Sequence, residues 1–77
     1  MRKVAIMLDT INKVGKFNNT VLKYPGEHLD LVSGRYRVDA KSLMGIFSLD
    51  LTKILTLEYD EEYESEFMEL FGEFIWD

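Results

Sequence analysis

The polar and apolar positions of this 77-residue chain repeat with two periods, one typical of strands and the other typical of helices. Residues 3–8 place Val4, Ile6 and Leu8 at alternate positions, which predicts a strand with one apolar face. Over residues 11–24 the apolar positions recur at helical spacing instead. These positions are Ile11, Val14, Phe17, Val21 and Tyr24.

Short local signals indicate where this first helix begins and ends. Asp9 and Thr10 are both favourable N-cap residues, because their side-chain oxygens can accept hydrogen bonds from the free amides of the first turn. Pro25-Gly26 is expected to end the helix after Tyr24, since proline cannot continue a helix and glycine readily adopts a left-handed turn. The sequence therefore predicts one amphipathic helix over residues 11–24.

The next segment, residues 29–40, has the pattern of a β-hairpin. Ser33-Gly34 is a turn signal between two stretches in which apolar and polar residues alternate. The apolar positions are Leu29 and Leu31 before the turn, and Tyr36, Val38 and Ala40 after it. We expect two antiparallel strands here, each with one face toward the core.

The remaining segments predict a short helix opened by Ser42, a strand over residues 54–59 and a terminal helix. The apolar stripe of the terminal helix is formed by Tyr63, Phe67, Leu70, Phe71, Phe74 and Ile75. Five glutamates fall largely on its opposite side, namely Glu62, Glu64, Glu66, Glu69 and Glu73. We interpret them as the solvated face of a helix and not as an acidic binding patch.

The order of these elements is β-α-β-β-α-β-α, which predicts an α+β domain. We expect four antiparallel strands, covered on one face by three helices. Neither a linker nor an internal repeat nor a low-complexity segment interrupts the pattern, so residues 1–77 are expected to form a single domain.

Charge and composition narrow the classes of function. The net charge is −5, and all basic residues lie at or before Lys53, which argues against nucleic-acid binding. The absence of cysteine removes disulfides and cysteine-bound zinc, and fits the reducing cytoplasm where we expect the protein. Asp9 ends the first apolar run too early for a signal peptide, and we expect no insertion into a membrane.

The residues give little support for catalysis. His28 is the only histidine and lies in a polar loop, where a surface position is the usual one. The five glycines are scattered and form no phosphate-binding pattern, and the glutamates of the terminal helix form no acid–base pair. We therefore expect neither enzymatic activity nor a metal or cofactor.

The segment AKSLMGIFSLD, residues 40–50, is unusual for a small acidic domain. Ser42 is a suitable N-cap for one short turn of helix that carries Leu43, Met44 and Phe47. An exposed cluster of this kind often marks a contact site, whereas the same residues half-buried would be ordinary core packing. The residue types alone favour neither of these two readings.

Residues 39–49, DAKSLMGIFSL, resemble the regulatory-serine segment of the HPr family, the small phosphocarriers of the bacterial sugar phosphotransferase system. The resemblance extends over about residues 3–75 and implies the open-faced sandwich of that family. It also implies phosphorylation of Ser42 by an HPr kinase and binding of a LacI-type repressor or of phosphotransferase-system proteins. The partner surface that it implies comprises Lys41, Leu43, Met44 and Phe47.

The chain departs from the HPr family at the phosphoacceptor. The family's histidine, within its Gly-(Ile/Leu)-His-Ala-Arg-Pro-Ala motif, falls at Ile11, and Lys13 stands where the motif has arginine. The resemblance therefore implies a regulator of carbon catabolite repression and not a histidine phosphocarrier. Two alternatives stay open: a protein-interaction domain that is never phosphorylated, and a small-ligand-binding α+β module.

Overall fold

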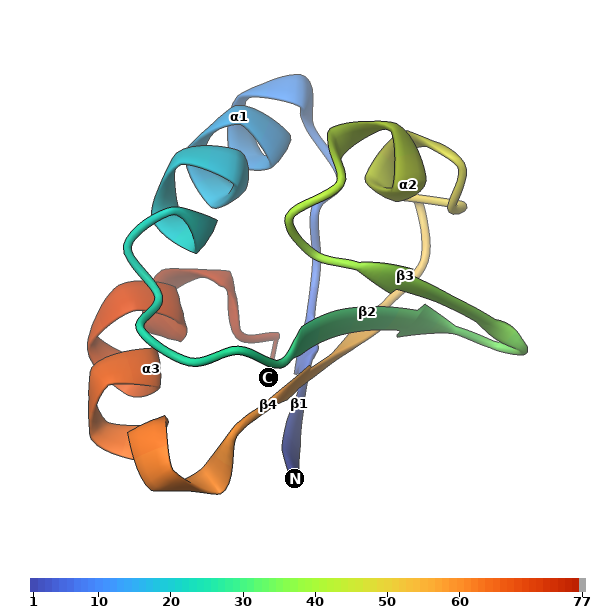
Figure 1. The fold of residues 1–77 in the computed structure, drawn as a ribbon. Helices are drawn as coiled ribbons and strands as arrows, with labels where there is room; N and C mark the ends of the chain where they lie inside the picture. The colour runs from blue at the N-terminus through green and yellow to red at the C-terminus, as the bar shows by residue number, and fades with distance from the viewer. Residues whose placement is uncertain (77) are drawn as a thin grey trace.

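The computed structural model describes residues 1–76, in which one four-stranded antiparallel sheet carries three α-helices on one face (Figure 1). The strands are β1 (Arg2–Ile6), β2 (Leu29–Ser33), β3 (Tyr36–Asp39) and β4 (Leu55–Tyr59). The α-helices are α1 (Ile11–Val21), α2 (Leu43–Phe47) and α3 (Glu64–Phe71), and the 3₁₀ turns η1 (Glu61–Tyr63) and η2 (Gly72–Phe74) flank α3. The predicted α+β class and the predicted order of elements are confirmed.

The strand order is β1-β4-β2-β3, so the last strand in the sequence lies at the centre of the sheet. Leu57 on β4 lies opposite Val4 on one side and opposite Leu31 on the other. Since side chains alternate between the two faces of a strand, this register places the apolar residues of three strands on the face that the helices cover. The buried apolar side chains are Ile6, Leu8, Val14, Phe17, Val21, Tyr24, Leu29, Leu31, Ala40, Ile46, Leu49, Leu55, Leu57, Tyr59, Phe67, Phe71 and Phe74.

Aromatic rings join α1 and α3 to the sheet. Phe67 stacks on Tyr59 with 3.6 Å between the ring centroids and 5° between the planes, and Phe71 lies 4.9 Å from Phe67. Phe17 of α1 packs at 5.5 Å from both Phe71 and Phe74. These rings bury large apolar areas, so they supply much of the hydrophobic stabilisation of this small domain.

The first helix is shorter than the sequence predicted. It ends at Val21, and Tyr24 follows in a tight turn in which its N–H donates to the Val21 carbonyl. Tyr24 is buried as expected, but its hydroxyl accepts a hydrogen bond from the Asp60 N–H at 2.9 Å. The turn and this tertiary contact hold Tyr24 outside the helix, so the last three residues of the predicted helix are not helical. Pro25-Gly26 therefore lies beyond the last helical residue, Val21, and does not itself end the helix.

Ile11 differs from the prediction more strongly. The helical spacing placed it on the buried stripe, yet 82% of the residue is exposed. Ile11 is the first residue of α1. The start of this helix extends beyond the sheet (Figure 1). Only the later stripe positions, from Val14 onward, face the core.

Two further boundaries differ by small shifts. The first strand covers Arg2–Ile6, so Leu8 is buried without being part of it. The hairpin turn is formed by Gly34-Arg35 instead of Ser33-Gly34, because Ser33 pairs with Tyr36. Gly34 has a φ of 60°, which suits the first central position of a two-residue II′ turn and is favourable for glycine alone.

The terminal helix is also shorter than the apolar stripe predicted. After η2, Ile75 becomes extended and forms an antiparallel bridge with Ile6. The Trp76 N–H donates to the Ala5 carbonyl at 2.9 Å, and the Met7 N–H donates to the Phe74 carbonyl. The chain therefore leaves the helix to satisfy backbone groups on the outer edge of β1.

The face of the sheet opposite the helices carries charged side chains. Arg37 on β3 donates to Asp30 on β2 at 3.1 Å and to Glu58 on β4 at 2.7 Å. The hydrogen bond that Arg37 donates to Glu58 lowers the pKa of the Glu58 carboxyl. None of the helices within residues 1–76 has both the length and the apolar character of a membrane span.

Candidate functional site

Ser42 lies at the junction between β3 and α2, in a turn that the backbone holds firmly. Its N–H donates to the Asp39 carbonyl at 2.9 Å, and the Lys41 N–H donates to the Asp39 side chain at 2.8 Å. The Ser42 hydroxyl oxygen accepts from the Gly45 N–H at 3.1 Å, and the backbone is extended, as an N-cap requires. Ser42 therefore caps α2 as predicted, and it is exposed.

The short helix α2 has one buried residue and an outer surface that is apolar. Ile46 is fully buried, and it alone of the five residues of α2 belongs to the core. Leu43 is 43% exposed, Phe47 54% and Met44 86%. Lys41 is exposed beside them, just before the cap. The site thus presents a hydroxyl, a cation and three apolar side chains to solvent, and its role as a partner surface remains a prediction.

Gly45 has a structural role that the sequence pattern did not reveal. A Cβ atom at this position would lie 3.1 Å from the Val38 Cβ and 3.2 Å from the Ser42 hydroxyl oxygen. Because glycine lacks that atom, α2 packs closely against β3 while the Ser42 side chain reaches the Gly45 N–H. Gly45, the glycine of the Lys-Ser-Leu-Met-Gly sequence, therefore allows the Ser42 N-cap to form where α2 packs on β3.

The start of α1 lies at the same end of the molecule as the start of α2 (Figure 1). The Thr10 side chain accepts from the Lys13 N–H at 3.1 Å, which makes Thr10 the N-cap. The ammonium of Lys13 pairs with Asp9 at 3.0 Å and lowers the pKa of the Asp9 carboxyl. Ile11, the position of the HPr phosphoacceptor in the resemblance, presents only an alkyl side chain to solvent.

His28 is held at the other end of α1, in the loop before β2. Its Nδ1 lies 3.0 Å from one oxygen of Asp60, and the other oxygen accepts from the Glu27 and His28 backbone N–H groups at 3.1 Å each. These hydrogen bonds, that of the His28 N–H above all, lower the pKa of Asp60. The charged carboxylate stabilises the loop at neutral pH, and this contribution is lost as the pH falls through the lowered pKa.

The surroundings of His28 are acidic. A shallow hollow of about 310 Å³ is lined there by Glu27, His28, Asp60, Glu62 and Tyr63. Over residues 1–76, no three histidine, aspartate or glutamate side chains lie in an arrangement that could hold a metal ion. The hydrogen bonds of Asp60 with Glu27 and His28 anchor this loop.

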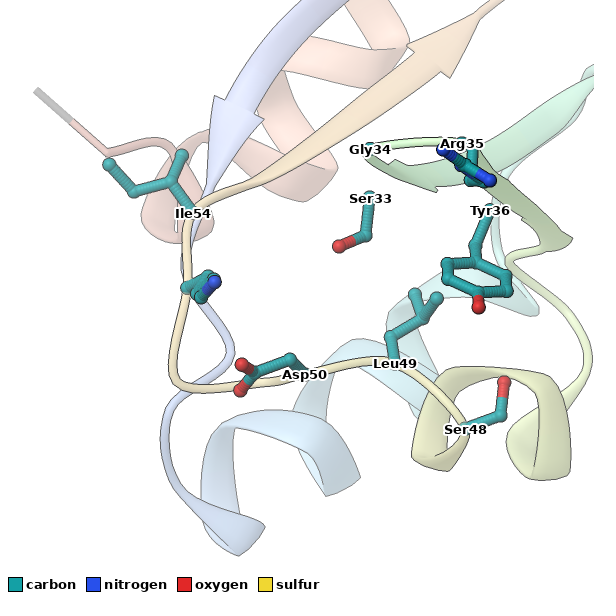
Figure 2. A pocket seen from close by; sticks show the side chains of 9 residues that line it. Ser33, Gly34, Arg35, Tyr36, Ser48, Leu49, Asp50 and Ile54 are labelled. Atoms are coloured by element: carbon teal, nitrogen blue, oxygen red, sulfur yellow. The ribbon is translucent and has the colours of Figure 1, made fainter.

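A larger hollow of about 630 Å³ lies between the hairpin turn and the segment that joins α2 to β4 (Figure 2). It is lined by Ser33, Gly34, Arg35, Tyr36, Ser48, Leu49, Asp50, Lys53 and Ile54. The sequence pattern did not reveal this site, because its walls come from segments more than ten residues apart.

Comparison with solved structures identifies the class of fold. The chain is similar to a protein described as "HPr-C-His" in a crystal structure from Thermoanaerobacter tengcongensis. The two structures superpose with a TM-score of 0.77 and 23% sequence identity, over 97% of this chain and 91% of the other. No protein-family model and no curated protein matches the sequence. The chain therefore has the HPr-like fold, the open-faced α+β sandwich that its sequence resemblance implied.

Proposed function

We propose that this protein is a member of the HPr family that regulates a protein partner through Ser42 and does not carry phosphate on histidine. The observation that carries the proposal is an exposed serine beside three exposed apolar side chains on an HPr-like fold. The sequence resemblance supports it by placing Ile11 where HPr has its phosphoacceptor histidine. The process suggested by the family resemblance is carbon catabolite regulation, with an HPr kinase and a LacI-type repressor as partners.

The surroundings of Ser42 suit a phosphorylated side chain. A phosphate would add about −2 charge and three acceptor oxygens at neutral pH. It would lie near the Gly45 N–H, which the Ser42 hydroxyl already contacts, and Lys41, the preceding residue, is exposed. Because Ser42 is outside the core, the modification is expected to change binding much more than stability.

The proposed contact surface consists of Lys41, Leu43, Met44 and Phe47, and we name it the α2 surface. Met44 and Phe47 are large, exposed and adjacent in one turn, which is typical of apolar anchors near the centre of an interface. A phosphate on Ser42 would then alter the charge at the border of this surface.

Phosphoryl transfer from phosphoenolpyruvate through an HPr requires an imidazole at the start of α1. Ile11 has no nucleophilic atom, and Thr10 carries a hydroxyl instead of an imidazole. His28 lies beyond the end of the same helix, with Nδ1 against Asp60 and with further carboxylates around it. Negative charge at that place would disfavour a phosphoryl group. Neither end of α1 therefore offers a suitable acceptor.

We expect no transfer when the protein is incubated with phosphoenolpyruvate and the first enzyme of the phosphotransferase system. An ordinary HPr in the same tube should acquire an acid-labile, base-stable phosphoryl group, whereas this chain should not. The measurement is phosphate incorporation by intact-mass spectrometry at alkaline pH. Label on this chain that disappears in His28→Gln would show that His28 is a carrier and would overturn this part of the proposal.

A second function, protein binding without phosphorylation, is favoured by the same exposure. The α2 surface is apolar in the unmodified chain, so it needs no phosphate to contact a partner. The two functions differ only in the modification of Ser42. The kinase experiment that ends the Discussion therefore distinguishes them.

A further inference from the structure

We propose that the hollow between the hairpin turn and the α2–β4 segment binds a small organic anion. The occupant that fits has an apolar or planar body and a carboxylate or phosphate group. Figure 2 shows the Ser33 hydroxyl pointing toward the middle of the hollow, with Tyr36 and Leu49 together on one side and Asp50 below. The volume of about 630 Å³ lies within the range of pockets that hold small ligands.

The apolar part of the hollow comes from three different elements. Leu49, just after α2, is 8% exposed and belongs to the core. Tyr36 begins β3 and is 68% exposed, and Ile54 precedes β4 and is 44% exposed. An aromatic ring of this exposure offers a face on which a planar ligand would stack and lose contact with water. The ligand body is therefore placed against Tyr36 and Leu49.

The charges in the lining favour an anion. Arg35 and Lys53 both line the hollow, and neither forms an ion pair with any residue of the described part of the chain. Asp50 is the one carboxylate of the lining. One of its oxygens accepts from the Thr52 N–H at 3.1 Å and from the Thr52 hydroxyl at 2.6 Å, so that oxygen is turned toward its own loop. The lining thus carries one net positive charge in a chain of net charge −5.

Hydroxyl groups complete the set of donors. Within residues 1–76, neither the Ser33 hydroxyl nor the Tyr36 hydroxyl forms a side-chain hydrogen bond, whereas the Ser48 hydroxyl donates to the Gly45 carbonyl at 2.6 Å. Arg35, Lys53 and Ser33 are therefore the groups available to an anionic head. Hydrogen bonds from charged donors are the stronger ones, so the two cations are expected to dominate affinity.

This site is separate from the α2 surface. Ser42 caps the start of α2 and Ser48 caps its end, so the two sites lie at opposite ends of a five-residue helix. The inference does not depend on phosphorylation of Ser42. Either one can fail without affecting the other.

The test is a titration of the whole ¹⁵N-labelled chain, followed by amide chemical shifts at constant ionic strength. Phenyl phosphate and benzoate are the two anionic probes, and benzyl alcohol is the uncharged probe of similar shape. We expect saturable shifts confined to residues 33–36 and 48–54 with at least one anion. The comparison of the two anions identifies the preferred head group. Benzyl alcohol should bind at least about tenfold more weakly, since it lacks the charge.

Matched charge variants complete the test. Arg35→Gln with Lys53→Gln should weaken the preferred anion at least about tenfold, because both charged donors are removed. Lys16→Gln with Lys23→Gln removes the same charge from exposed positions on and after α1, and should leave affinity unchanged. The proposal is overturned if neither anion saturates the site, if benzyl alcohol binds equally well, or if both double variants weaken binding alike. A dispersed spectrum of each variant verifies that it remains folded.

Discussion

Phe67→Ala is expected to lower the free energy of unfolding by about 3–5 kcal/mol, the usual cost of removing a buried phenylalanine ring. Phe67 is fully buried between Tyr59, on which it stacks, and Phe71 of the same helix. Small domains have a total stability of roughly 5–15 kcal/mol, so this variant should be close to unfolding. Urea denaturation of the variant and the parent chain measures the difference.

Met68→Ala is the matched control, because the next residue of α3 is 43% exposed. We expect it to cost less than about 1 kcal/mol, as surface substitutions do. Equal losses from both variants would mean that α3 does not pack on the sheet through Phe67. The packing of Phe67 between Tyr59 and Phe71 would then be contradicted.

Ile46→Ala should lower the free energy of unfolding by about 2–5 kcal/mol, whereas truncations on the outer side of the same helix should have little effect. Ile46 is fully buried, while Met44 and Phe47 are 86% and 54% exposed. Met44→Ala is expected to change stability by less than about 0.5 kcal/mol and Phe47→Ala by less than about 1 kcal/mol. Each of the two should instead weaken partner binding by about 1–2 kcal/mol.

Chemical denaturation of the three α2 variants gives a direct comparison, because all the changes lie within one short helix. If Met44→Ala and Phe47→Ala are as destabilising as Ile46→Ala, the apolar turn belongs to the core. The α2 surface would then not be a docking site. The opposite result, stability retained and binding lost, assigns the two side chains to the partner.

The fold followed from the sequence because its elements carry strong local signals. Alternation at Leu29 and Leu31 was enough to identify the inner face of a strand, and both residues are buried. The helical stripe through Val14 and Phe17 identified α1 in the same way. In these segments the local pattern and the tertiary packing favour the same conformation, which is why the prediction succeeded.

The misplaced boundaries are positions where a tertiary contact outweighs a local signal. Tyr24 fits the stripe of α1, but the chain leaves the helix before it and the Tyr24 hydroxyl meets the Asp60 N–H. Ile75 fits the stripe of the terminal helix, but it pairs with Ile6 on the edge of β1. Neither partner is near in sequence, so periodicity alone could not reveal these contacts.

The candidate sites were predictable to different degrees. The N-cap position of Ser42 followed from its residue type and its place before a short apolar turn. Its regulatory role was implied only by the resemblance of residues 39–49 to HPr. The exposure of Met44 and Phe47 was left open, since it depends on whether another element covers α2. The hollow near the hairpin turn was not found, because Arg35 and Lys53 line one space only when the hairpin turn and the α2–β4 segment come together.

The role of Ser42 as the control point is tested most directly by incubation with ATP and an HPr kinase, followed by mapping of the modified residue. The parent chain should incorporate one phosphate, and peptide sequencing by mass spectrometry should place it on Ser42. Ser42→Ala should incorporate none, while Ser48→Ala, which changes the exposed serine at the other end of α2, should be labelled like the parent. If the kinase labels an ordinary HPr in the same tube and leaves this chain unmodified, or labels it at another residue, Ser42 is not the control point.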